Sequence, residues 1–154
     1  MKRRRVLVDS SFVDDLVDPA ARDHDDARRV FEQLIGEYEI GRTVLYSLAP
    51  GADSVGDSRR AAVLRVCDVV QPRRWLTREG GRVVREHPET GQGRATSLVL
   101  MRRLGIGEIA TFDGFFADHG IPTVPGRGNC HPNEQQPDTN GETFAKRSGR
   151  GTAN

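Results

Sequence analysis

Short apolar runs alternate with segments of helical spacing along the first 125 residues of the chain. The run Val6-Leu7-Val8 is followed by Asp9-Ser10-Ser11, whose side chains suit helix capping, and then by apolar residues at helical spacing. This pattern predicts a buried strand that turns directly into a helix. Similar reasoning places strands at about 6–8, 39–44, 109–112 and 121–124, and helices at about 12–17, 19–36, 59–66, 77–86, 94–104 and 115–119.

Strands that alternate with helices are typical of α/β domains, in which helices cover both faces of a parallel sheet. We therefore expect a central parallel sheet of about four strands. A chain of 154 residues has the length of one ordinary domain. We place this domain at residues 1–125, because beyond Pro125 the sequence is rich in Gly, Pro, Asn, Gln and Thr, with Phe144 as its only large apolar residue.

Residues 126–154 are predicted to form a flexible tail, since they lack the apolar side chains whose burial would offset the entropy of ordering. Deleting this segment should leave the melting temperature nearly unchanged, which calorimetry of the full and truncated chains would measure. A large fall in melting temperature would show instead that Phe144 or its neighbours dock on the domain.

The sequence contains neither a membrane span of about 18 apolar residues nor the apolar region of a signal peptide. Its two cysteines, Cys67 and Cys130, lie far apart, so we expect no disulfide framework. These features predict a cytoplasmic protein without a membrane-spanning segment.

Charge is unevenly distributed, although the net charge is only +1. Residues 9–39 carry ten acidic side chains and three arginines, whereas residues 58–87 carry eight arginines and three acids. Within the second stretch, Arg73, Arg74 and Arg78 flank Trp75. This combination suits single-stranded RNA, because arginines bind phosphates and aromatic rings stack on bases. The alternative is a set of solvated arginines on helix faces, with Trp75 packed against the domain.

Asp9 and Asp113 each directly follow an apolar strand, at the edge where open parallel sheets gather their active sites. Two carboxylates that meet there repel each other unless a cation lies between them, which predicts a site for a hard metal ion. Alternatively, each aspartate caps the helix that follows it.

Three segments together carry a resemblance to a known family: VLVDSSFVDDLVDP, RATSLVLMRRLGIGEIATFDGFF and HGIPTV. From Arg4 to about Val124 the chain resembles PIN domains, in particular the VapC toxins of bacterial toxin–antitoxin pairs. The resemblance implies an endoribonuclease that depends on Mg²⁺ or Mn²⁺ and uses four acidic residues at the edge of a parallel sheet. It also implies an RNA substrate, a homodimer and a cognate antitoxin protein that silences the enzyme.

Only two of the four acidic positions are acidic in this chain. By the resemblance, Asp9 and Asp113 are the first and last metal-binding acids, and Ser10 takes a small hydroxyl position beside the first. The second acid corresponds to Ser47 in VLYSLA, and the third to Arg94, nineteen residues before Asp113. Asp118 and Asp53 are candidates to supply a missing carboxylate.

We therefore predict that metal-dependent RNA cleavage is weakened or lost, because Arg94 replaces attraction for a cation by repulsion. Arg94 is expected to pair with one of the two aspartates as an internal substitute for the cation. On this hypothesis, Arg94→Asp increases the affinity for magnesium, and adding Ser47→Glu increases it further. The alternative function is a non-catalytic PIN-like module that binds RNA or an antitoxin-like partner.

Overall fold

The computed structural model describes residues 2–51 and 57–126, and all structural statements below refer to these residues. Five parallel strands form one sheet in the order β3-β2-β1-β4-β5. The strands are β1 (Arg4–Val8), β2 (Thr43–Leu48), β3 (Cys67–Val70), β4 (Glu108–Ala110) and β5 (Thr123–Val124). The helices are α1 (Ser10–Val17), α2 (His24–Glu39), α3 (Ser58–Leu64), α4 (Arg74–Glu86), α5 (Gln92–Leu104) and α6 (Gly114–Asp118), with a short 3-10 helix, η2 (Pro88–Thr90).

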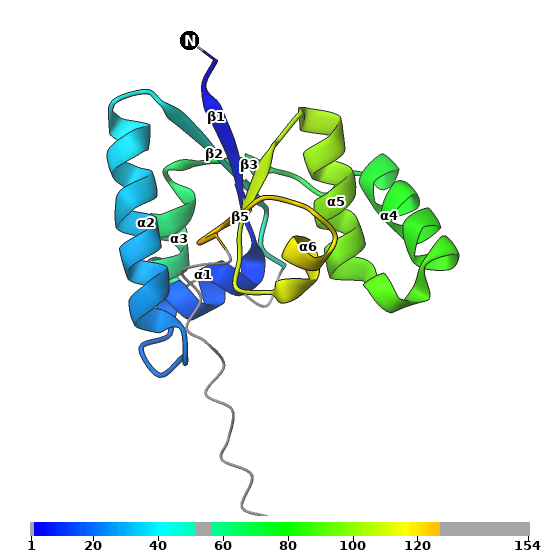
Figure 1. The fold of residues 1–154 in the computed structure, drawn as a ribbon, viewed down its shortest axis with the longest axis horizontal. Coiled ribbons are helices and arrows are strands. Elements are labelled where there is room, and N and C mark those ends of the chain that lie inside the picture. Colours follow the sequence, from blue (N-terminus) through cyan, green and yellow to red (C-terminus); the bar gives the residue numbers. More distant parts are fainter. Residues whose placement is uncertain (1, 52–56, 127–154) are drawn as a thin grey trace, which may run out of the picture.

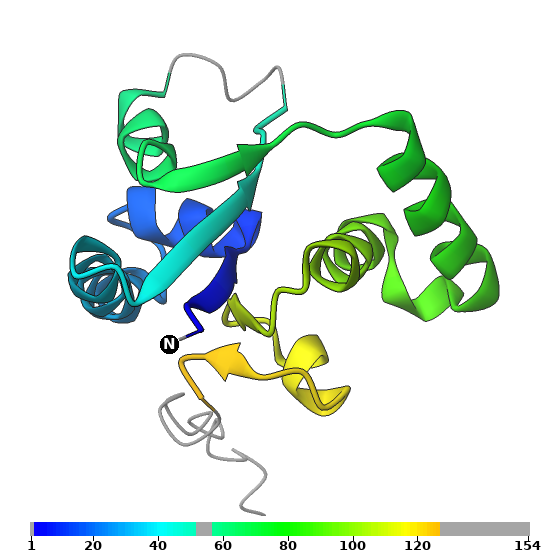
Figure 2. The same ribbon diagram turned by 90° about the horizontal axis from the view of Figure 1, so that it is seen from above.

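Helices cover both faces of the sheet, as the alternating pattern predicts. Helices α1, α2 and α3 lie on one face and α5 and α6 on the other, while α4 packs on the outer side of α5 (Figures 1 and 2). The side chains of β1 alternate between the two faces, because successive residues of a strand point in opposite directions. Val6 and Val8 enter the core beneath α1–α3, and Leu7 enters the core beneath α5.

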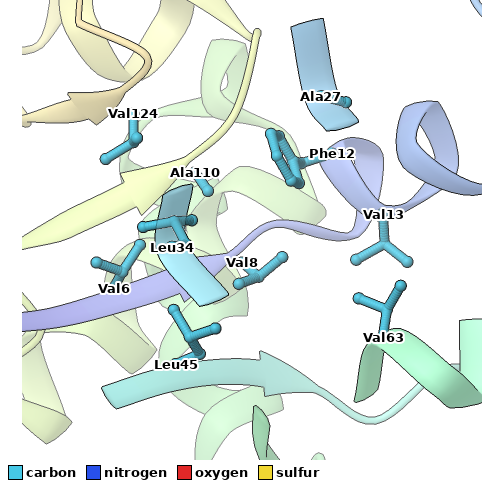
Figure 3. Packing of buried hydrophobic residues seen from close by; sticks show 10 residues of the cluster. All are labelled: Val6, Val8, Phe12, Val13, Ala27, Leu34, Leu45, Val63, Ala110 and Val124. Carbon is cyan, nitrogen blue, oxygen red and sulfur yellow. The ribbon is translucent and has the colours of Figure 1, made fainter. Parts of the chain in front are cut away.

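The core beneath α1–α3 joins strands that are far apart in the sequence. Its buried members are Val6, Val8, Phe12, Val13, Ala27, Leu34, Leu45, Val63, Ala110 and Val124 (Figure 3). Phe12 extends this core through a stacked contact with Phe112, at a distance of 5.5 Å between the ring centroids. Because Phe12 follows β1 and Phe112 follows β4, this contact packs the two chain turns at one end of the sheet against each other.

The sequence-based expectation of about four strands was one too few. Residues 67–70 pair with β2 as the edge strand β3, which makes the sheet five-stranded. Helix α4 also begins at Arg74, before the predicted residue 77, so that Trp75 lies in its first turn.

The predicted end of α2 at Gly36 was also wrong, since the helix continues to Glu39. Its end is instead set by Gly41, which has a φ of 71° that favours glycine. The backbone N–H of Arg42 donates to the Glu37 carbonyl at 2.9 Å, and that of Gly41 donates to the Tyr38 carbonyl at 2.9 Å. These two bonds form a Schellman motif, and β2 consequently begins only at Thr43.

At the amino-terminal edge of the sheet, Arg4 joins three elements. Its guanidinium donates to Glu108 of β4 at 2.6 and 2.7 Å and to Glu37 of α2 at 2.9 and 3.1 Å. The hydroxyl of Thr43 also donates to Glu37, at 2.7 Å. The hydrogen bonds to Glu108 are the main cause of a raised pKa of Arg4, so this network is a fixed set of charges.

Within the part of the chain that the structure describes, no helix is both long and apolar enough to cross a membrane.

Substituting Leu45 tests how much the core beneath α1–α3 contributes to the stability of the domain. Its side chain is fully buried, whereas that of Val69 on the edge strand is 38% exposed. Leu45→Ala should lower the free energy of unfolding by about 2–5 kcal/mol, because it leaves a cavity in a packed core. Val69→Ala is the matched control and should cost less than about 1 kcal/mol in urea unfolding. Similar losses for the two variants would contradict this account of the core.

Candidate functional site

Asp9 and Asp113 lie at the carboxyl edge of the sheet, after neighbouring strands. Asp9 follows β1 and precedes α1, and Asp113 follows β4 and precedes α6 (Figure 1). Asp113 caps α6 by accepting a hydrogen bond from the Phe115 backbone N–H at 3.1 Å. The Asp9 side chain makes no such bond to α1, although its backbone occupies the capping position. The capping interpretation therefore holds for Asp113 only.

The hydroxyl of Thr111 connects the two aspartates. It donates to Asp9 Oδ2 at 3.2 Å and accepts from the Asp113 backbone N–H at 3.1 Å. Thr111 is 2% exposed, so this link is shielded from water. Ser11 donates a second hydrogen bond to the same Asp9 oxygen, at 2.6 Å.

Arg94, in the first turn of α5, binds the Asp113 carboxylate with two hydrogen bonds. Its Nε donates to Oδ2 at 2.7 Å, and its Nη2 donates to Oδ1 at 3.0 Å. This is the bidentate geometry in which the planar guanidinium matches a carboxylate. The guanidinium carbon also lies 4.6 Å from the centroid of the Phe115 ring, within cation–π range. Arg94 is therefore held in place by two kinds of contact.

The charges of this site act on one another. Partial burial alone would raise the pKa of Asp113. The hydrogen bonds from Arg94 and from the Phe115 N–H, together with the charge of Arg94, outweigh burial, so the pKa of Asp113 lies below its usual value. The hydrogen bond to Asp113 is the main cause of the raised pKa of Arg94, and the charges of Asp113 and Asp9 act in the same direction. With both carboxylates ionised, Arg94 leaves the three side chains with one net negative charge.

The residues present do not fit a divalent metal ion. Mg²⁺ takes oxygen ligands in near-octahedral geometry, and both oxygens of Asp113 already accept hydrogen bonds from Arg94. Across residues 2–51 and 57–126, no group of three or more His, Cys, Asp or Glu side chains is arranged to hold an ion. A magnesium or manganese site built on Asp9 and Asp113 would therefore require Arg94 to move away.

Other residues that the resemblance singled out lie elsewhere. Ser47 lies within β2, not at the start of a helix; it is 2% exposed, and its hydroxyl is 3.4 Å from the Val8 carbonyl oxygen. Ser10 is exposed in the first turn of α1, and it is Ser11 that contacts Asp9. Asp118 is exposed at the last residue of α6, and Asp53 lies outside the described residues.

The sequence analysis missed Thr111 and Ser11. Each lies two residues from an aspartate, and Ser, Thr and Asp side chains commonly form hydrogen bonds over this spacing. The pairs Thr111-Asp113 and Asp9-Ser11 are therefore the signal in the sequence that points to them.

The arginines proposed to bind RNA belong to the start of α4 and to the residue before it. Arg73, Arg74 and Arg78 are exposed at the start of α4. The neighbouring Trp75 packs beneath Arg103, whose guanidinium carbon is 5.4 Å from the Trp75 ring centroid. Arg103 is in the last turn of α5, nine residues or about 14 Å along the helix from the turn that carries Arg94. The start of α4 thus lies near the last turn of α5 at Trp75, whereas Gly80, further along α4, lies against Gln92 and Thr96 at the start of α5.

Comparison with solved structures identifies the fold. VapC20 of Mycobacterium tuberculosis, a toxin that cleaves the sarcin-ricin loop, aligns with a TM-score of 0.57 and 21% identity over 75% of this chain and 95% of that chain. This chain has a PIN fold of the VapC type. The finding confirms the fold that the sequence resemblance implied. No protein-family model and no curated protein matches the chain.

Within this PIN fold, Thr111 is predicted to stabilise the carboxyl edge. Thr111→Val should lower the free energy of unfolding by about 1–3 kcal/mol, because the variant leaves the part-buried Asp113 N–H and the Asp9 carboxylate without their bond to the Thr111 hydroxyl. Thr111→Ser keeps the hydroxyl and should cost clearly less when both variants are unfolded in urea. Equal losses would show that the hydroxyl link contributes nothing.

Proposed function

We propose that this protein is a VapC-like RNA-binding protein of the cytoplasm in which metal-dependent RNA cleavage is weakened or lost. The observation that carries the proposal is the bidentate pair between Arg94 and Asp113 at the edge where the fold gathers its carboxylates. Cleavage by the family mechanism requires several free carboxylates around Mg²⁺ or Mn²⁺. Here one carboxylate is bound by a guanidinium, and Ser47, at the proposed second acidic position, is buried in β2.

RNA binding is assigned to Arg73, Arg74 and Arg78. Their guanidinium groups make no hydrogen bond or ion pair with any described residue, whereas Arg82 of the same helix is paired with Glu86 at 3.2 Å. Unpaired, exposed guanidinium groups are suited to phosphate oxygens. Trp75 has no part in this proposal, because Arg103 lies over its ring.

A second candidate function is the binding of an antitoxin-like protein. A groove between α1, α2 and α3 is lined by apolar side chains, including Leu16, Phe31 and Val63, with Arg28 and Arg59 also in its lining. Glu32 also lines the groove and pairs with Arg28 at 3.8 Å, so it is the apolar side chains that suit a partner segment with an apolar face. A homodimer is also proposed, from the family resemblance alone, and light scattering of the purified protein would test it.

RNA cleavage and RNA binding by the same preparations would test the main proposal. Wild type incubated with RNA and Mg²⁺ or Mn²⁺ should cleave no faster than Asp9→Asn. The triple variant Arg73→Ala, Arg74→Ala, Arg78→Ala should bind RNA at least about tenfold more weakly, and the dependence of log K on log salt should become shallower by about 2.

The matched control removes three exposed arginines elsewhere on the surface: Arg3→Ala, Arg22→Ala and Arg42→Ala. It has the same net charge as the first triple variant, so it should retain most of the RNA affinity if position matters more than total charge. Metal-dependent cleavage that Asp9→Asn abolishes would contradict the proposed loss of catalysis. Equal weakening by the two triple variants would contradict the assignment of the RNA-binding surface.

A further inference from the structure

Two carboxylates at the end of adjacent parallel strands need a compensating charge. Asp9 and Asp113 are linked through the single hydroxyl of Thr111, so they share one polar cluster. The charges of both aspartates act on Arg94, and each raises its pKa, so one cation serves both carboxylates. The positive charge that the structure supplies at this edge is that of Arg94.

We propose that Arg94 is a built-in counter-ion that keeps the carboxyl edge assembled without a metal ion and thereby excludes divalent cations from it. The proposal concerns the counter-ion of the two aspartates, and it holds whether or not the protein binds RNA. It explains why the donor set at this edge does not fit a divalent cation although the fold brings two carboxylates together.

The position of Arg94 suits this role because its guanidinium is anchored on both sides. Asp113 binds its Nε and Nη2, and the Phe115 ring lies against it. Asp113 and Phe115 both belong to the start of α6, so one short segment fixes the guanidinium. Helix α5 has no acidic residue in its own first turn and no side-chain cap. The negative charge beside this turn comes from Asp113, which pairs with Arg94. The side chain is thus part of the fold and does not extend freely into solvent.

Asp9 interacts with Arg94 through its charge, and the Thr111 hydroxyl links the Asp9 carboxylate to the backbone of Asp113. The charge of Asp9 contributes to the raised pKa of Arg94. Thr111 then fixes Asp9 relative to the Asp113 backbone. Removing the guanidinium would leave two carboxylates that are held by their remaining hydrogen bonds but lack a cation. This is the arrangement in which a divalent ion stabilises a folded protein.

Metal titration of Arg94 variants would test the proposal without RNA. Arg94→Asp exchanges the counter-ion for a third carboxylate. Its melting temperature should rise with MnCl2 relative to KCl of equal ionic strength, and calorimetry should give Mn²⁺ binding at least about tenfold tighter than that of wild type. Arg102→Asp, an exposed arginine of the same helix, is the matched control and should behave as wild type does. Adding Asp9→Asn to Arg94→Asp should abolish the gain.

A carboxylate introduced by Ser47→Glu would be desolvated among the strands, so the Arg94 variants give the cleaner test. If Arg94→Asp does not fold, Arg94→Gln removes the charge while keeping a long side chain, and its melting temperature should still rise with MnCl2. Two results would overturn the proposal: wild-type binding of Mn²⁺ as tight as that of Arg94→Asp, or no metal-dependent stabilisation in either Arg94 variant.

Discussion

The bidentate ion pair between Arg94 and Asp113 is the interaction on which the rest of the site depends. It joins the first turn of α5 to the first residue before α6, and it leaves the Asp113 carboxylate with no oxygen free of a hydrogen bond. Thr111 holds Asp9 beside this pair, since its hydroxyl donates to the Asp9 carboxylate and accepts from the Asp113 backbone N–H. A fold that places two carboxylates at one edge therefore carries an internal cation there. Chemistry that requires an exchangeable metal ion is disfavoured in such a site.

An arginine also pairs with carboxylates at the opposite edge of the sheet. Arg4 binds Glu37 and Glu108, so that one arginine stabilises two carboxylates from separate elements. The two edges differ in geometry, because Arg4 contacts both of its acids directly, whereas Arg94 contacts Asp113 and reaches Asp9 through charge alone. This comparison supports a structural role for the Arg94 pair.

Local patterns and the family resemblance predicted most of the elements, Asp9 and Asp113, and the pairing of Arg94 with one of these aspartates. They did not predict strand β3 or the other contacts between distant segments. Apolar runs that end in aspartate were enough to place Asp9 and Asp113 at one edge, because parallel strands share a direction. The end of α2 was misplaced because Gly36 and Gly41 look alike in sequence, and only the backbone hydrogen bonds at Gly41 distinguish them. The burial of Ser47 within β2 was not predicted, because the resemblance gives an order of residues and not the face of the strand that each one occupies.

The most direct test of the central claim is a crystal structure of the wild-type protein grown with Mn²⁺, with anomalous diffraction data collected at the manganese edge. The account predicts no anomalous peak between Asp9 and Asp113, and two intact hydrogen bonds from Arg94 to Asp113. A manganese peak bound by both aspartates, with the Arg94 side chain displaced, would contradict it.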